Sequence, residues 1–288
     1  MTTLRWIVTG AGGMLGHDVM VALREAGHEV VGLGRGDLDI TDADAVRAAF
    51  DRHRPDVVVN CAAYTAVDDA ETDEERAYQV NAVGPRLLAE AAAAHGTRLV
   101  HVSTDYVFAG DARAPYAEDA KPAPATAYGR TKLAGEEAVL DTLPTTGVVV
   151  RTAWLYGAHG GNFVRTMMRL ERERDTLEVV DDQRGQPTWT VDVAERLVLL
   201  GADPRAAGIF HATSAGEATW YELAREVFRL LGADPDRVRP TTTDRFPRPA
   251  PRPAYSVLGH ARWAELGLGP IRHWREALHA AFPTLPRP

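Results

Sequence analysis

The sequence predicts an α/β fold, a doubly wound parallel sheet with a smaller lobe built from the C-terminal part of the chain. Two observations predict it. Short apolar runs alternate with helical stretches through the first half of the 288 residues, an order typical of parallel sheets covered by helices on both faces. A turn rich in glycine lies at the first junction between a strand and a helix, where such folds place theirs.

The expected elements of the first half follow from periodicity. The strands are short runs rich in β-branched residues, and the helices are longer stretches with apolar residues every three or four positions. This pattern predicts strands at 6–8, 30–33, 57–59, 99–103 and 148–151, and helices at 15–26, 73–94 and 128–140.

The second half is less regular. Its pattern predicts helices at 162–172, 191–201 and 220–231, and a strand at 209–211 that returns to the sheet. Residues 239–253 are rich in proline and arginine, so we expect an extended segment there.

The composition excludes some classes of function. The net charge is −8, whereas a nucleic-acid-binding protein needs a basic face, so we expect no nucleic-acid partner. The single cysteine, Cys61, allows no intrachain disulfide. The N-terminus has no signal-peptide pattern, and no stretch approaches the roughly 20 apolar residues of a membrane span. We therefore expect a cytoplasmic protein with no membrane partner.

The glycine turn predicts a dinucleotide site. Gly10 permits the tight turn, Gly13 lets a diphosphate approach the backbone, and Gly16 lets helix and strand pack closely. The first residues of the helix, Met14 and Leu15, offer free N–H groups to the diphosphate. We therefore assign residues 1–155 to a Rossmann domain, to which 190–213 return, and 156–288 mainly to a substrate-binding lobe.

The end of the second strand indicates the choice of cofactor. An acid at this point holds the ribose hydroxyls of NAD, whereas an arginine accommodates the 2′-phosphate of NADP. The strand runs into Arg35, which favours NADPH and leaves NADH as an alternative. Asp39 and Ile40 follow at a distance from which an acid can accept from the adenine amino group. Further cofactor contacts are expected from the segment after the third strand, which contains Cys61, Ala62, Ala63 and Tyr64.

Two residues with acid–base chemistry are four positions apart on one expected helix. Tyr128 and Lys132 share a helix face, and a lysine ammonium stabilises a phenolate. Lowering the tyrosine pKa from about 10 by roughly three units needs about 4 kcal/mol, which we expect from Lys132 together with a cationic nicotinamide in a desolvated cleft. Thr104 ends the fourth strand, at the edge where open α/β sheets bind ligands, and can donate to a substrate carbonyl. These three residues predict a carbonyl reductase.

Several segments together resemble the dTDP-4-dehydrorhamnose reductase family of extended short-chain dehydrogenases. They run through nearly the whole chain, at 9–16, 60–68, 103–108, 128–132, 151–156, 182–188 and 252–258. The resemblance implies NADPH-dependent reduction of dTDP-4-dehydro-L-rhamnose to dTDP-L-rhamnose, in the pathway of rhamnose biosynthesis. The partner is then a dTDP-sugar, with no metal. A homodimer remains an alternative to a monomer.

The resemblance also assigns roles to single residues. Tyr128 becomes the proton donor, Lys132 its partner and Thr104 the hydrogen-bond partner of the carbonyl and of the tyrosine. The sugar or its diphosphate would be contacted by Asp105, Trp154, Gln183, Gln186 and Arg252.

Sequence features bear on three alternative functions. Related dehydratases carry a second acid where this chain has Tyr106, so reduction fits better than dehydration. A non-catalytic regulatory subunit, like that of methionine adenosyltransferase, would not need Thr104, Tyr128 and Lys132 together. A reductase of another dTDP-ketosugar, such as the one that forms dTDP-dihydrostreptose, would share all three, so this alternative stays open.

Overall fold

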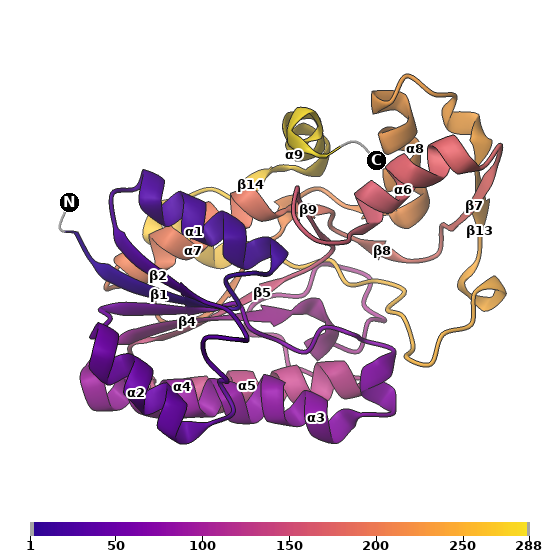
Figure 1. Ribbon diagram of the computed structural model, residues 1–288. Coiled ribbons are helices and arrows are strands. Elements are labelled where there is room, and N and C mark those ends of the chain that lie inside the picture. The colour runs from indigo at the N-terminus through magenta and orange to yellow at the C-terminus, as the bar shows by residue number, and fades with distance from the viewer. Residues whose placement is uncertain (1–2, 287–288) are drawn as a thin grey trace.

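Six parallel strands form one sheet in the computed structural model, which describes residues 3–286 (Figure 1). The strands are β1 (Arg5–Thr9), β2 (Glu29–Leu33), β3 (Val57–Asn60), β4 (Arg98–Thr104), β5 (Gly147–Thr152) and β10 (Gly208–His211). Their order is β10-β5-β4-β3-β1-β2, so the chain reverses direction across the sheet between β1 and β3. The doubly wound parallel sheet is confirmed, and its switch point lies where the glycine turn leaves β1.

Helices cover both faces of this sheet (Figure 1). One face carries α1 (Met14–Glu25) and α7 (Thr190–Ala202), and the other carries α2 (Ala43–His53), α4 (Gly84–His95) and α5 (Ala127–Thr142). Alternate strand residues enter the two cores: Trp6 and Val8 pack on the α1 side, whereas Ile7 packs with α2 and α4. This burial on both faces explains why the strands are continuously apolar rather than alternating.

The helix predicted at 73–94 is interrupted. It consists of α3 (Glu74–Tyr78), a π-helical turn at Gln79–Val83 and α4. The turn places the buried Asn81 against α5, where its Nδ2 donates to Thr131 Oγ1 at 3.1 Å. Its Oδ1 accepts from the Tyr64 backbone N–H at 2.9 Å. The interruption therefore ties the segment after β3 to α5, as π-turns near functional sites often do.

The C-terminal lobe has its own apolar core. It contains α6 (Phe163–Glu173), β7 (Leu177–Val180), α8 (Trp220–Leu230), β13 (Val238–Thr241) and α9 (Trp274–Ala281). Two-residue and three-residue strands connect these elements: β6 (Leu155–Tyr156), β8 (Arg184–Gly185), β9 (Thr188–Trp189), β11 (Ser214–Ala215), β12 (Ala218–Thr219) and β14 (Ile271–His273). The segment expected to be extended at 239–253 begins in β13, which pairs with β7.

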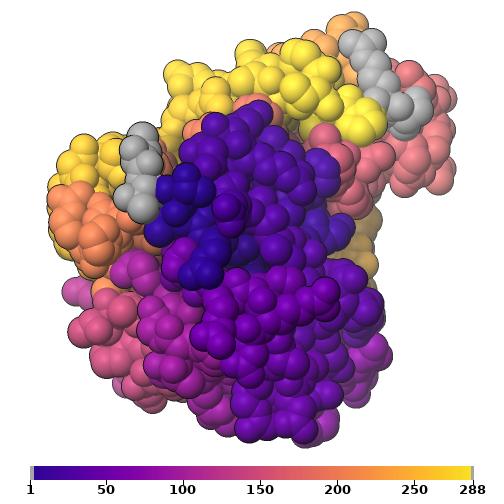
Figure 2. Space-filling view, turned by 60° about the vertical axis from the view of Figure 1, so that its left-hand side comes forward, coloured from indigo at the N-terminus to yellow at the C-terminus, as the bar shows by residue number. Residues whose placement is uncertain are grey.

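The two halves of the chain are also interleaved. Figure 2 shows indigo N-terminal segments beside the orange and yellow segments of the second half on one face of the molecule. Consistently, Trp263 and Ile271 belong to the same core as Trp6 of β1. Within residues 3–286, no helix is long and apolar enough to cross a membrane.

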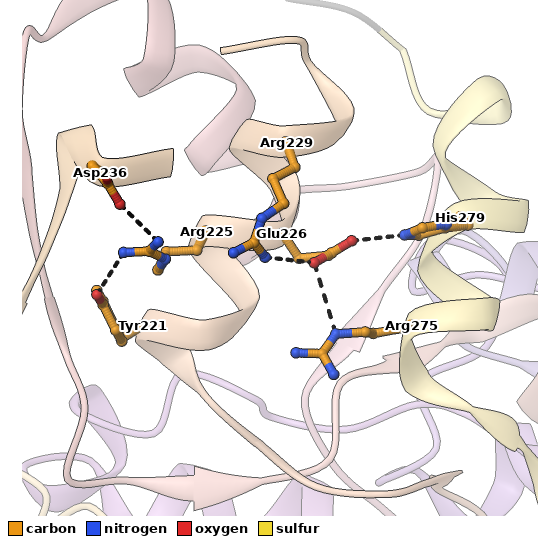
Figure 3. Close-up of polar contacts among 7 residues, drawn as sticks. All are labelled: Tyr221, Arg225, Glu226, Arg229, Asp236, Arg275 and His279. Atoms are coloured by element: carbon orange, nitrogen blue, oxygen red, sulfur yellow. Dashed lines mark hydrogen bonds and ion pairs between the residues drawn. The ribbon is translucent and has the colours of Figure 1, made fainter. Parts of the chain in front are cut away.

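A buried carboxylate joins the last two long helices of the lobe (Figure 3). Glu226 of α8 accepts from Arg229 at 2.9 Å and from His279 of α9 at 2.7 Å, and Arg275 of α9 lies 3.7 Å away. Burial raises the pKa of Glu226, but the hydrogen bonds from His279 and Arg229 outweigh it and lower the pKa below its usual value. The carboxylate therefore stays charged and holds α9 on α8.

Candidate active site

The glycine turn brings the backbone of β1 against the segment after β3. Gly10 has a φ of +65°, and a Cβ there would lie 2.6 Å from the backbone N of Ala62. A Cβ on Gly16 would collide with the Gly10 carbonyl. Only glycine satisfies both positions, since an added side chain has no room. The resulting turn leads straight into α1.

The N-terminus of α1 suits an anion. Its N-cap residue, Gly13, has no side chain that could cap the helix. The first turn, which begins with Met14 and Leu15, holds no acidic residue. A Cβ on Gly12 would meet nothing within 4 Å. The free N–H groups and the positive end of the helix dipole therefore face open space, an arrangement that fits the diphosphate of a dinucleotide.

Three other predicted cofactor residues follow β2, and they differ in exposure and in the contacts that their side chains make. Arg35 is exposed on the turn that follows β2. The Asp39 carboxylate accepts from the Thr41 backbone N–H at 2.9 Å and from its hydroxyl at 2.7 Å. Ile40 is buried and packs on Gly84. Ile40 therefore contributes core packing, while Arg35 keeps its guanidinium in solvent.

Cys61, Ala62 and Ala63 follow β3 and pass beneath the glycine turn. The Cys61 backbone N–H donates to Thr9 O at 3.2 Å, which continues the strand pairing for one more residue. Burial raises the pKa of the Cys61 thiol to about 12, so the thiol stays protonated and unreactive.

The three predicted catalytic residues meet at the carboxyl end of β4. Tyr128 lies in the first turn of α5, whose N-cap Thr126 accepts from the Gly129 N–H at 3.0 Å. Thr104 is the last residue of β4 and donates to Asp105 Oδ1 at 3.0 Å. All three side chains are at least nine-tenths buried, with Lys132 only 1% exposed. They form one compact group beside the dinucleotide turn.

Burial governs the electrostatics of Tyr128. It raises the pKa of Tyr128 to about 12, and a hydrogen bond with the Thr104 hydroxyl only partly opposes this rise. The lowering expected from Lys132 together with a cationic nicotinamide stays a prediction. Lys132 Nζ donates to the Val102 carbonyl of β4 at 2.7 Å. Tyr128 is therefore held as a neutral phenol, the form that donates a proton.

Lys132 and Asp105 have shifted pKa values of their own. Burial lowers the pKa of Lys132 to about 8, although the nearby Glu136 carboxylate opposes this shift. Burial raises the pKa of Asp105 to about 6, against the hydrogen bonds of Ser256 and Thr104. Asp105 Oδ2 is buried and has no hydrogen-bond partner among residues 3–286.

The predicted sugar-site residue Trp154 belongs to an aromatic pair that sequence reasoning missed. It lies two residues past β5 with a φ of +48°, a strained conformation that costs roughly 1–3 kcal/mol. Its ring stacks on Trp220 with centroids 3.5 Å apart. Gln183 accepts from Trp220 Nε1 at 3.1 Å and donates to Thr243 at 2.9 Å. The structure therefore brings Trp154 and Gln183 together through Trp220.

Gln186 and Arg252 are both engaged with the protein. Gln186 Oε1 accepts from the Thr213 hydroxyl at 2.7 Å and from the Leu258 N–H at 2.8 Å, so it braces two loops. Arg252 Nη2 donates to Asp68 at 2.7 Å across the gap between the lobe and the segment after β3. The sequence offered no sign of this ion pair, because its partners are 184 residues apart.

A cavity of about 210 Å³ lies at the junction of these segments. It is bounded by Tyr106, Phe108, Thr126, Arg252 and neighbouring backbone. Thr126 immediately precedes α5, so the cavity opens near the turn that carries Tyr128.

Two buried charges behind α5 were not predicted. Arg151 of β5 donates to Glu136 of α5 from Nη2 at 2.7 Å and from Nε at 3.0 Å, and both side chains are at most 2% exposed. The pair links α5 to β5 of the sheet. The sequence feature that could have indicated this pair is Arg151 itself, a charged residue near the end of an otherwise apolar strand.

One group of ionisable side chains near α1 has the composition of a metal site. His17, Asp18 and His159 offer ligand atoms within 4.8 Å of one another. The two imidazole rings stack with centroids 3.5 Å apart. Two imidazoles on one tetrahedral ion, with nitrogen at roughly 2.0–2.1 Å from it, would hold their centroids about 5 Å apart. The observed stacking is therefore a ring contact rather than a pair of converging ligands.

Known proteins share this architecture over the full chain. The family described as RmlD substrate binding domain matches residues 4–286. A probable dTDP-4,6-dihydroxy-2-methyloxan-3-one 4-ketoreductase from Streptomyces antibioticus is 61% identical, over 98% of this chain and 96% of the relative. A dTDP-4-dehydrorhamnose reductase from Streptomyces griseus is 59% identical, over 98% of this chain and 94% of the relative.

A solved structure extends the likeness to three dimensions. The dTDP-4-dehydrorhamnose reductase from Bacillus anthracis in complex with NADP is 37% identical, with a TM-score of 0.94. The alignment covers 98% of this chain and 100% of that one. With the family match over nearly every residue, these likenesses show that the chain belongs to the dTDP-4-dehydrorhamnose reductase family.

Proposed function

We propose that the chain reduces dTDP-4-dehydro-L-rhamnose to dTDP-L-rhamnose with NADPH. Members of this family are NAD(P)-dependent oxidoreductases that act on dTDP-ketosugars, and this chain is such an enzyme. One observation carries the proposal. Thr104, Tyr128 and Lys132 form a buried group at the edge of the sheet, directly beside a turn that fits a dinucleotide.

Three residues of the chain have separate roles in the proposed reduction of the carbonyl. When bound at the glycine turn, NADPH supplies the hydride that the C4 carbonyl carbon accepts. Tyr128, held as a neutral phenol, gives its hydroxyl proton to the carbonyl oxygen, which becomes the C4 hydroxyl. When the carbonyl oxygen is bound, the Thr104 hydroxyl turns its single proton from Asp105 Oδ1 to that oxygen. Lys132, in its charged form, stabilises the phenolate that remains.

Binding of the sugar nucleotide rests on the lobe and on the segment after β3. Asp105 Oδ2 accepts from a sugar hydroxyl, since this buried oxygen has no other partner among the described residues. The stacked Trp154 and Trp220 offer an apolar face, and Gln183 lies beside them. Arg252 lines the cavity and forms an ion pair with Asp68. A bound diphosphate competes with Asp68 for the Arg252 guanidinium.

Arg35 is expected to select NADPH through the 2′-phosphate. A charge-assisted pair of this kind contributes about 1.5–3 kcal/mol, so Arg35→Ala should weaken NADPH binding roughly 10- to 150-fold and leave NADH almost unchanged. The check is a titration of both cofactors with both proteins. Arg113→Ala, which removes an arginine from the loop after β4, serves as the charge control. Equal loss of both cofactors in Arg35→Ala would contradict the assignment.

A second candidate is the reduction of another dTDP-ketosugar. It is favoured by the relative at 61% identity, whose name gives a different 4-keto substrate. The two are separated by supplying dTDP-4-keto-6-deoxyglucose and NADPH with and without the partner epimerase, and identifying the product sugar. dTDP-L-rhamnose formed only with the epimerase supports the first proposal. Reduction without the epimerase supports the second.

A further inference from the structure

A chain of buried hydrogen bonds behind Lys132 has a direction that the structure determines. It begins at Asn60, the last residue of β3, which is fully buried. Asn60 Oδ1 accepts from the Thr9 hydroxyl at 2.6 Å and from the Ala62 backbone N–H at 3.2 Å. A backbone N–H can only donate, so the amide oxygen must face Ala62 and the amide nitrogen must face the other way.

The next group in the chain is His101, a fully buried residue of β4. Asn60 Nδ2 lies 3.0 Å from His101 Nδ1. Because the amide nitrogen donates, Nδ1 must accept and cannot carry a proton. Burial, with the positive charge of Lys132, holds the pKa of His101 well below its usual value, so the ring is neutral. Its one proton is therefore on Nε2.

That proton faces Lys132. His101 Nε2 lies 3.4 Å from Lys132 Nζ. An N–H group directed at an ammonium destabilises the charged form of the lysine. A neutral amine, in contrast, can accept a hydrogen bond from that N–H. We infer that His101 is a positioning residue, oriented by Asn60, that shifts Lys132 toward its neutral form and so sets the protonation of the side chain that supports Tyr128.

The other groups around Lys132 do not favour its neutral form. On its own helix α5, Glu136 favours the ammonium, but this carboxylate is paired with Arg151 of β5. Cys61, after β3, keeps its proton because burial raises its pKa to about 12. The Val102 carbonyl of β4 accepts from either form of the amine. Among residues 3–286, these neighbours therefore favour the ammonium or accept from both forms, and only burial acts with the proposed effect of His101.

The chain offers a direct readout, because its only lysines are Lys121 and Lys132. In the full-length protein labelled with ¹³C at lysine Cε, the exposed Lys121 serves as an internal reference for the titration of Lys132. His101→Leu removes the N–H and should raise the Lys132 midpoint by roughly one pH unit. His101→Gln can accept from Asn60 and donate to Lys132, so it should stay within a few tenths of a unit of wild type.

Two further arms keep the inference testable. His211→Gln alters another fully buried histidine, on β10, whose ring contacts Gly259 O, and should not move the Lys132 midpoint. If His101→Leu does not fold, ¹⁵N spectra of histidine-labelled wild type, assigned with His101→Gln, still report the tautomer. We expect the Nε2–H form across pH 5–9.

The inference uses the proposed role of Lys132, but its test needs neither substrate nor cofactor. An unchanged or lowered Lys132 midpoint in His101→Leu overturns it, as does an Nδ1–H tautomer. If the titration behaves as expected while no dTDP-ketosugar is reduced, the proposed function fails and this inference stands.

Discussion

Replacing Tyr128 with phenylalanine should lower kcat at least about 100-fold and leave NADPH binding within a few-fold of wild type. The substitution removes the one hydroxyl that the mechanism uses as an acid and keeps the ring. That ring contacts Tyr106 edge to face with centroids 5.6 Å apart, so the packing of the first turn of α5 should survive. Steady-state turnover with a dTDP-ketosugar, together with a cofactor titration, measures both quantities.

Tyr78→Phe is the matched control for this prediction. Tyr78 is 45% exposed at the end of α3, so loss of its hydroxyl should leave turnover unchanged. If Tyr128→Phe retained turnover within about threefold of wild type, Tyr128 would not be the proton donor.

The largest expected effect on stability comes from the buried pair Glu136–Arg151. Arg151→Met leaves the Glu136 carboxylate buried without its bidentate partner, which costs about 3–5 kcal/mol. At a few degrees per kcal/mol, the midpoint of thermal unfolding should fall by roughly 10 °C. Calorimetry or circular dichroism at constant pH and ionic strength measures the change.

Two comparisons separate burial from charge in that result. The double variant Arg151→Met with Glu136→Leu removes both charges and should recover much of the lost stability. Arg130 of α5 and Glu74 of α3 form a similar two-bond pair that is about half exposed, so Arg130→Met should cost less than about 1 kcal/mol. Equal losses for Arg151→Met and Arg130→Met would show that burial does not govern the energetics of the pair.

Local patterns in the sequence predicted much of the fold. The strands of the main sheet are continuously apolar, and their positions were found to within one or two residues, as β3 and β4 illustrate. α2 was not predicted because only Val46 and Phe50 of its eleven residues are buried, which leaves little periodic signal. The break at Gln79–Val83 was missed because a π-turn keeps helical composition and differs only in which carbonyl each N–H reaches.

The site was predicted where its residues are neighbours in sequence. Tyr128 and Lys132 share a helix face, and Thr104 ends a strand, so local spacing places all three. The partners of Trp154 and Arg252 are Trp220 and Asp68, which only the tertiary fold brings near. The pKa values depend on burial, which spacing does not report, and this is why the rise of the Tyr128 pKa could not be predicted from the sequence.

The proposed substrate is a 4-ketosugar activated by dTDP, and a comparison with the same sugar lacking its nucleotide tests this proposal. The remote nucleotide and diphosphate supply binding energy that holds the carbonyl against Tyr128, so their removal should reduce kcat as well as affinity. We expect kcat/KM for dTDP-4-keto-6-deoxyhexose to exceed that for the same sugar without its nucleotide by at least about 1000-fold, the scale of two charge-assisted contacts. Equal kcat/KM values for the two compounds would contradict the account and leave a generic carbonyl reductase.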